Sequence, residues 1–249
     1  MIENAALPPP EKKKVFGPWA TAGLGLATGV IFIIAQAAVT LIFIITRLVQ
    51  NPGVDFMQLT EELLNDGDLL IAATIASAVA CTGFILLMIK ARGGEPVPEY
   101  LALKNISVKT VLVMLAVTIA FIAVSTGISY ILDRSVDSDY VSGAYANASF
   151  PFLFWVAIVL FAPVFEEVFL RGFMFIGFRQ SRLGPAGAII ITAIIWALMH
   201  IQYSYYEMTV IFFLGIILGI VRHRTGSLWS PLIIHSVNNL IAMVSVSLL

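Results

Sequence analysis

Seven long apolar runs determine what this chain can fold into. They lie near residues 18–46, 69–89, 108–132, 150–178, 186–203, 205–221 and 228–249. A helix needs about 20 apolar residues to cross the hydrocarbon core of a bilayer, and most of the runs approach or exceed this length. Hydrophobic residues make up 59% of the chain and charged residues only 12%, which leaves too little polar surface for a water-soluble globule. We therefore expect an all-α, polytopic transmembrane helical bundle.

The basic residues gather on one side of the bundle if successive runs cross the membrane in alternating directions. Eleven of the 14 Lys and Arg residues then share the side of the N-terminus: Lys12, Lys13, Lys14, Lys90, Arg92, Lys104, Lys109, Arg179, Arg182, Arg222 and Arg224. Acidic residues gather on the other side: Asp55, Glu61, Glu62, Asp66, Asp68, Asp133, Asp137, Asp139 and Glu207. Because Lys and Arg in short loops favour the cytoplasm, we expect an integral multi-pass protein with a cytoplasmic N-terminus.

Three other features narrow the class of protein. Lys12–Lys14, the apolar run after them and Ala35-Gln36-Ala37 loosely resemble a cleaved signal peptide, but the apolar stretch continues to Ile45, which is too long for one. No segment carries a sustained basic face, which argues against a nucleic-acid partner. The single cysteine, Cys81, excludes a disulfide framework and is expected to be a small buried hydrophobe.

The chain divides into a tail and one membrane domain. Residues 1–17 combine a proline run with the lysine cluster and are predicted to form a disordered cytoplasmic tail. Residues 18–249 are expected to form a single transmembrane domain, with scaffold helices over 18–149 and the candidate site over 150–249, where the intramembrane charges and histidines concentrate. Outside the apolar runs, the spacing predicts an interfacial helix over 54–66 and a turn-rich linker over 91–107.

Three ionisable residues lie inside the fourth apolar run: Glu166, Glu167 and Arg171. Each costs about 2.5–3.5 kcal/mol at the centre of a bilayer, so each needs compensation. Glu167 and Arg171 are four residues apart on one helix face and are expected to form an ion pair. Glu166 lies about 100° around the helix and has no basic partner one turn away, so we expect it to face another group as a general base or acid. A structural lock between helices is the alternative.

His200 is the first group that Glu166 is expected to face. Glu166 precedes Arg179 by 13 residues, roughly 20 Å of helix, and His200 follows Ala186 by 14 residues, roughly 21 Å. Two adjacent antiparallel helices would therefore bring Glu166 and His200 to one depth in the membrane. Interhelical hydrogen bonding alone is the alternative role for this histidine.

His235 fits the same depth less well. It lies only about 10 Å along its helix if that helix begins at Leu228, and an irregular segment over 225–231 that lines protein or water would reconcile the two depths. Asn239, four residues on, is expected to orient the imidazole or to donate to an oxyanion, with interhelical hydrogen bonding alone as the alternative. Other polar or small residues nearby are predicted to be structural: His223 in a solvated loop, and Gly215 and Gly219 as a close helix contact.

In combination, these residues resemble the CAAX-type and bacteriocin-processing intramembrane endopeptidases, the CPBP family. The resemblance rests on four motifs that occur in order over residues 150–249: Glu166-Glu167 with Arg171; Trp196 with His200; Phe212, Gly215 and Gly219 with Thr225-Gly226-Ser227; and His235 with Asn239. Trp196 stands where Phe is usual, which we interpret as a mild departure at an apolar position. The family is all-helical with about eight membrane segments, so seven or eight transmembrane helices are expected.

The resemblance implies roles for these residues. Glu166 and His200 would activate water for attack on a peptide bond, His235 and Asn239 would stabilise the oxyanion, and Glu167 and Arg171 would support the site. The family is also described as metalloproteases, in which Glu166, His200 and His235 would bind zinc, an accepted catalytic ligand set. Because the sequence lacks a His-Glu-x-x-His helix, we expect no metal, with zinc as the alternative.

The resemblance also bears on substrate and location. It implies a membrane-associated peptide or protein substrate, prenylated in the CAAX case, and we expect a prokaryotic cell membrane as the location. Two other function classes stay open. A proton- or ion-coupled transporter would also place carboxylates and histidines in the membrane, although no inverted repeat is visible. A non-catalytic immunity or scaffold protein could share the same fold.

Overall fold

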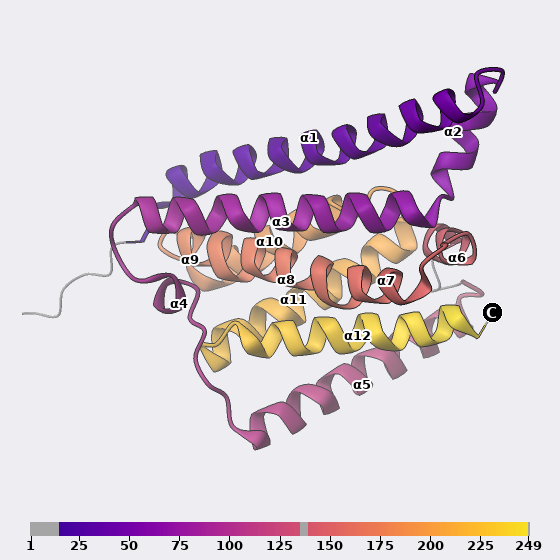
Figure 1. The fold of residues 1–249 in the computed structure, drawn as a ribbon. Helices are drawn as coiled ribbons and strands as arrows, with labels where there is room; N and C mark the ends of the chain where they lie inside the picture. Colours follow the sequence, from indigo (N-terminus) through magenta and orange to yellow (C-terminus); the bar gives the residue numbers. More distant parts are fainter. Residues whose placement is uncertain (1–14, 135–138, 249) are drawn as a thin grey trace, which may run out of the picture.

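The seven predicted apolar runs all form helices, which run side by side as a bundle (Figure 1). The computed structural model describes residues 15–134 and 139–248. Six helices in these residues are long and apolar enough to cross a membrane: α1 (Pro18–Gln50), α3 (Gly67–Ala91), α5 (Val108–Ile131), the composite helix Pro151–Phe178, α11 (Tyr205–Thr225) and α12 (Trp229–Ser247). The seventh, α10 (Gly184–Leu198), is shorter. The all-α polytopic bundle is thus confirmed.

The composite helix changes its hydrogen-bond register twice. Its α-helical parts are α7 (Pro151–Val156), α8 (Ala162–Glu167) and α9 (Phe175–Phe178), and π-helical stretches at Ala157–Phe161 and Val168–Met174 separate them. Single π-helical turns inside α-helices often occur at functional sites. Glu166 and Glu167 are therefore the last two residues of α8, a short α-helical part with one π-helical stretch before it and another after it.

Short elements complete the described part of the chain. The helix predicted at 54–66 is confirmed as α2 (Phe56–Leu64), and Asp55 caps its first turn by accepting hydrogen bonds from two backbone N–H groups. The linker 91–107 is more ordered than expected, because it contains α4 (Val97–Tyr100) and buries Tyr100. The third short helix is α6 (Asp139–Ala146). Most of the predicted tail, and Lys12–Lys14 within it, lies outside the described residues.

Helix α11 is longer than the apolar run that predicted it. A capping box of Ser204 and Glu207 starts the helix, and Gly226 ends it with a left-handed backbone at φ 64°. The helix therefore includes Arg222, which we had expected at the surface. Its side chain is instead buried, at 2% exposure, because the last turn of α11 packs inside the bundle. His223, one residue on, is exposed as predicted.

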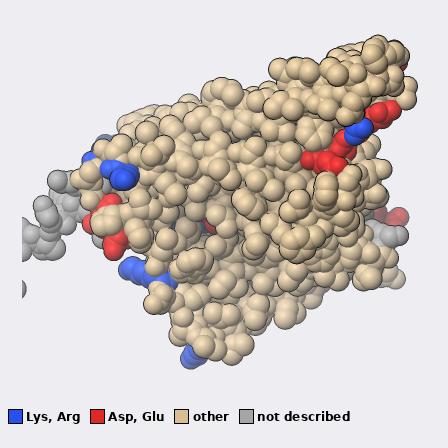
Figure 2. All heavy atoms as spheres, viewed as in Figure 1, with Lys and Arg blue, Asp and Glu red and all other residues tan. Residues whose placement is uncertain are grey.

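The outer surface has the charge distribution of a membrane protein. Figure 2 shows Lys, Arg, Asp and Glu side chains at the two ends of the bundle, with an almost uncharged band between them. Large apolar side chains face outward along the helices, such as Trp19, Leu26 and Val108 at 90%, 75% and 76% exposure. In water such a surface would be unfavourable, so the chain is an integral multi-pass membrane protein.

Helices α10 and α11 approach each other closely, as the two glycines predict. A Cβ atom added at Gly215 would lie 3.0 Å from Cβ of Ala193, and one added at Gly219 would lie 3.0 Å from Cγ2 of Ile189. Only residues without a side chain allow this separation. The close contact brings the backbone of α11 next to the charged residues of the composite helix.

Candidate active site

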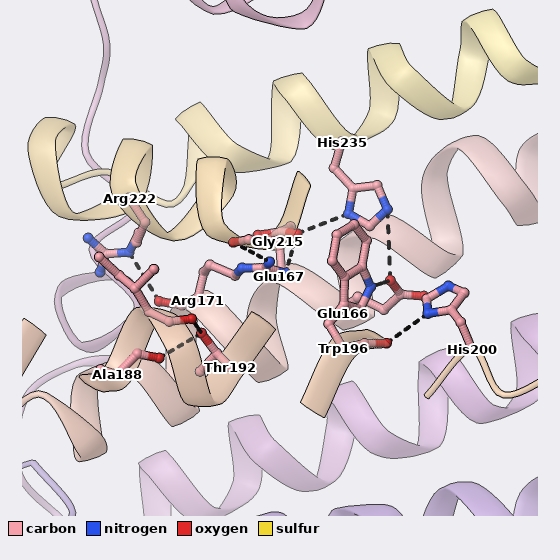
Figure 3. A network of polar contacts seen from close by, with 11 residues as sticks. Glu166, Glu167, Arg171, Ala188, Thr192, Trp196, His200, Gly215, Arg222 and His235 are labelled. Carbon is pink, nitrogen blue, oxygen red and sulfur yellow. Dashed lines mark hydrogen bonds and ion pairs between the residues drawn. The ribbon is translucent and has the colours of Figure 1, made fainter. Parts of the chain in front are cut away.

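The ion pair predicted inside the membrane is present and fully buried. Nη1 of Arg171 donates to Oε1 of Glu167 at 3.0 Å, and both side chains are at most 1% exposed. The same carboxylate oxygen accepts a hydrogen bond from Nδ1 of His235 at 2.9 Å. Glu167 therefore joins Arg171 of its own helix to His235 of α12 (Figure 3).

Arg171 has three further partners that the sequence did not reveal. Its Nη2 donates to the carbonyl of Gly215 at 3.1 Å, and its guanidinium lies 4.8 Å from the ring centroid of Trp196. Its own carbonyl accepts a hydrogen bond from Nε of the buried Arg222. Gly215 was expected to serve packing alone, but its close approach also supplies an acceptor for a buried charge, which such a charge requires.

Glu166 faces groups of other helices, as its lack of a basic partner one turn away suggested. Its Oε2 accepts a hydrogen bond from the indole Nε1 of Trp196 and lies 3.8 Å from Nε2 of His235. It lacks a basic partner on its own helix, as predicted, because its partners come from α10 and α12. The residue is only 9% exposed, and within the described part of the chain its Oε1 has no hydrogen-bond partner.

Trp196 is the residue whose role sequence reasoning missed. We interpreted it as an apolar position, but it is the hydrogen-bond donor to Glu166 and is itself buried, at 2% exposure. Its ring also lies edge-on to both imidazoles, with centroids 5.6 Å from His200 and 4.9 Å from His235. A signal was available in the sequence, since a buried Trp N–H normally finds an acceptor.

His200 follows the end of α10 and is partly buried. Its Nδ1 lies 2.8 Å from the carbonyl oxygen of Trp196. A carbonyl only accepts hydrogen bonds, so Nδ1 carries the hydrogen and, in the neutral ring, Nε2 has a free lone pair. In the view of Figure 3 the Glu166 carboxylate lies between the rings of His235 and His200. Among the described residues Glu166 and His200 share no direct hydrogen bond.

The depth mismatch of His235 is resolved by where α12 begins. The segment before it is buried against the linker: Oγ of Ser227 donates to the carbonyl of Lys104 at 2.7 Å, and the N–H of Leu228 donates to the carbonyl of Ala102 at 3.0 Å. Leu228 is 1% exposed. Because α12 starts inside the protein, seven residues are enough to bring His235 level with both carboxylates.

Asn239 does not orient His235 in this structure. Its Nδ2 donates to the carbonyl of Ile158 at 2.9 Å, in a π-helical turn where the N–H of Ala162 bonds five residues back to Ala157. In this register Pro163 would be the partner of Ile158, but proline has no N–H. Asn239 therefore satisfies a backbone carbonyl of the helix that carries the two carboxylates, and Glu167 orients His235 instead.

The donors of the alternative zinc set do not converge. In the described ranges, no group of three or more His, Cys, Asp and Glu side chains is arranged so that it could hold a metal ion. Nδ1 of His200 contacts a backbone carbonyl, Nδ1 of His235 contacts Glu167, and Glu166 accepts from Trp196. Each of the three residues thus has one side-chain atom engaged in another contact.

Comparison with known proteins identifies the part of the chain that carries this network. Residues 148–241 match the family model described as type II CAAX prenyl endopeptidase Rce1-like. The match contains every site residue described above, from Glu166 to Asn239. Comparisons with curated proteins and with solved structures gave no match. Residues 148–241 of this membrane protein are therefore similar to the type II CAAX prenyl endopeptidase Rce1-like family, a family of peptidases.

Proposed function

We propose that this chain is an intramembrane endopeptidase that hydrolyses a peptide bond of a membrane-associated peptide or protein, with water activated by Glu166. The observation that supports it most is the placement of Glu166, a carboxylate 9% exposed inside a membrane helix with His235 3.8 Å from it and Trp196 hydrogen-bonded to it. A buried carboxylate beside imidazoles suits proton transfer more than it suits packing.

The geometry supports a general-base role for Glu166. Its Oε2 is held by Trp196, while its Oε1 has no partner among the described residues and can accept a proton from water. The water oxygen attacks the carbonyl carbon of the peptide, and its proton passes to Glu166 and then to the leaving amine as the C–N bond breaks. His200 assists with its Nε2 lone pair, because its Nδ1 hydrogen is directed at the carbonyl of Trp196.

His235 is assigned the stabilisation of the oxyanion. In its imidazolium form His235 would donate from Nδ1 to Glu167 and from Nε2, which lies 3.8 Å from Oε2 of Glu166, to an oxyanion formed beside that carboxylate. Asn239 contributes the second hydrogen of its amide, since one is used by Ile158.

The reaction is proposed to need no metal ion, because the sequence lacks a His-Glu-x-x-His helix and no three His, Cys, Asp or Glu side chains of the described residues are arranged to hold one. Purified protein is expected to contain zinc well below one ion per chain and to retain its activity in 1,10-phenanthroline. Inductively coupled plasma mass spectrometry and the cleavage rate with and without chelator measure this. Stoichiometric zinc whose removal abolishes cleavage, with recovery on adding zinc back, would overturn the metal-free mechanism.

The orientation proposed places the N-terminus in the cytoplasm of a prokaryotic cell. The ends of α3 and α5 that carry Lys90, Arg92, Lys104 and Lys109 then face the cytoplasm, as short basic loops do. The substrate's scissile bond must reach the depth of Glu166, so an extended, membrane-inserted segment or a lipid-modified C-terminus meets the requirement.

Comparing membrane peptides between cells that carry the wild-type chain and cells that carry Glu166→Gln tests the proposed function. Uncleaved precursors are expected to accumulate in the Glu166→Gln cells. Cells that carry His223→Gln, at an exposed position outside the network, are the matched control and should match the wild type. Identical peptide populations in all three would contradict the peptidase assignment, and ion flux abolished by Glu166→Gln in liposomes would favour a transporter.

A further inference from the structure

Trp196 connects groups of the site that come from three helices. Its indole Nε1 donates to Glu166, its backbone carbonyl accepts from Nδ1 of His200, and its ring lies against His235. We propose that Trp196 is a positioning residue that fixes the general base and the assisting histidine relative to each other. This inference rests on the proposed function and adds a residue to it.

The indole ring is itself in contact with Arg171 and His235. The guanidinium of Arg171 lies 4.8 Å from its centroid, and His235 contacts it edge-on, with the two ring planes 69° apart. On the α11 side, a Cβ added at Gly215 would lie 3.1 Å from Cε3 of the indole, so the backbone there leaves little free space. The donor N–H therefore has a set direction before substrate binds, which lowers the cost of organising the site.

The hydrogen bond has a direct chemical consequence for Glu166. The N–H occupies Oε2 and leaves Oε1 as the atom that can accept a proton from water. Because His200 bonds to the backbone of the same tryptophan, one residue contacts both proton-handling groups. A phenylalanine ring would fill the same space but would offer no donor.

Trp196→Phe in the full-length protein tests the kinetic consequence. We expect kcat to fall about tenfold or more with KM within about twofold, since a hydrogen bond to a charged group is lost from the site and not from substrate binding. Trp155→Phe is the matched control, because its indole donates to Tyr145 at 3.3 Å away from the site, and it should behave as the wild type.

A second measurement needs neither activity nor the folding of the Trp196 variant. The chain has four tryptophans, so a 15N-indole correlation spectrum has four side-chain peaks, and Trp19→Phe, Trp155→Phe and Trp229→Phe assign the Trp196 peak by elimination. We expect Glu166→Gln to move the Trp196 indole proton upfield, because a neutral amide is a weaker acceptor than a carboxylate. The other three peaks should stay in place and serve as internal controls.

The outcomes separate this inference from the proposed function. A Trp196 indole peak that ignores Glu166→Gln, or a Trp196→Phe enzyme with wild-type kcat beside an inactive Glu166→Gln, would overturn the positioning role alone. Cleavage that is equal in Glu166→Gln and wild type would instead overturn the proposed function, and this inference with it.

Discussion

Glu166→Gln is expected to lower kcat for peptide cleavage by about 10³-fold in the purified, liposome-reconstituted protein. Gln keeps the shape of the side chain and can still accept the hydrogen bond from Trp196, but it cannot take a proton from water. General acid–base catalysis contributes about 10²–10⁴-fold, and Glu166 is the central proton acceptor in the proposed mechanism. A fluorogenic peptide derived from an accumulated precursor measures the rate.

His200 gives a second test of the mechanism, because it is proposed to act on the same water molecule as Glu166. We expect His200→Ala to lower kcat by about 10²-fold, and the double variant to be hardly slower than Glu166→Gln alone. Residues that act as one unit show such non-additivity. His223→Ala, at an exposed site, is the control. Rate losses that multiply in the double variant would mean that the two residues act in separate steps, contrary to the mechanism.

Hydropathy predicted the helices well because every segment that crosses a bilayer must be apolar over most of its length. Every helix that crosses it must be apolar over about 20 residues and must satisfy its own backbone. The register changes in the composite helix were not predictable in this way, since a π-helical turn and an α-helical turn can have the same hydropathy. Pro163 was the available signal, because a proline inside a helix removes a backbone donor.

In the candidate site, the contact within one helix was predictable from the sequence, and the contacts between helices were not. The Glu167–Arg171 ion pair followed from spacing on one helix, and it is present. The hydrogen bonds of Glu167 to His235 and of Trp196 to Glu166 join residues 68 and 30 positions apart, and spacing on a single helix says nothing about them. For His235 the assumed surface start of α12 was wrong, because the segment before the helix is buried inside the protein.

Arg171→Met is expected to lower the free energy of unfolding by about 3–5 kcal/mol, the cost of removing one partner from a buried ion pair. Met roughly fills the volume of the aliphatic part of Arg171 and leaves the charge of Glu167 with His235 as its remaining charged partner. The carbonyl of Gly215 also loses its donor, which was bound at 3.1 Å. Reversible unfolding in mixed detergent micelles, followed by circular dichroism, measures the change, with the exposed Arg224→Met as control.

The double variant Glu167→Gln with Arg171→Met decides whether the effect is electrostatic. If the cost of Arg171→Met comes from an uncompensated carboxylate, neutralising Glu167 as well should recover part of the lost stability, so the double variant should be less destabilised than the sum of the single ones. His235 would then face a neutral amide in place of the carboxylate that bonds it at 2.9 Å, so activity should stay low even where stability returns. Strictly additive losses would show instead that Arg171 stabilises the fold mainly through its contacts with Trp196 and α11.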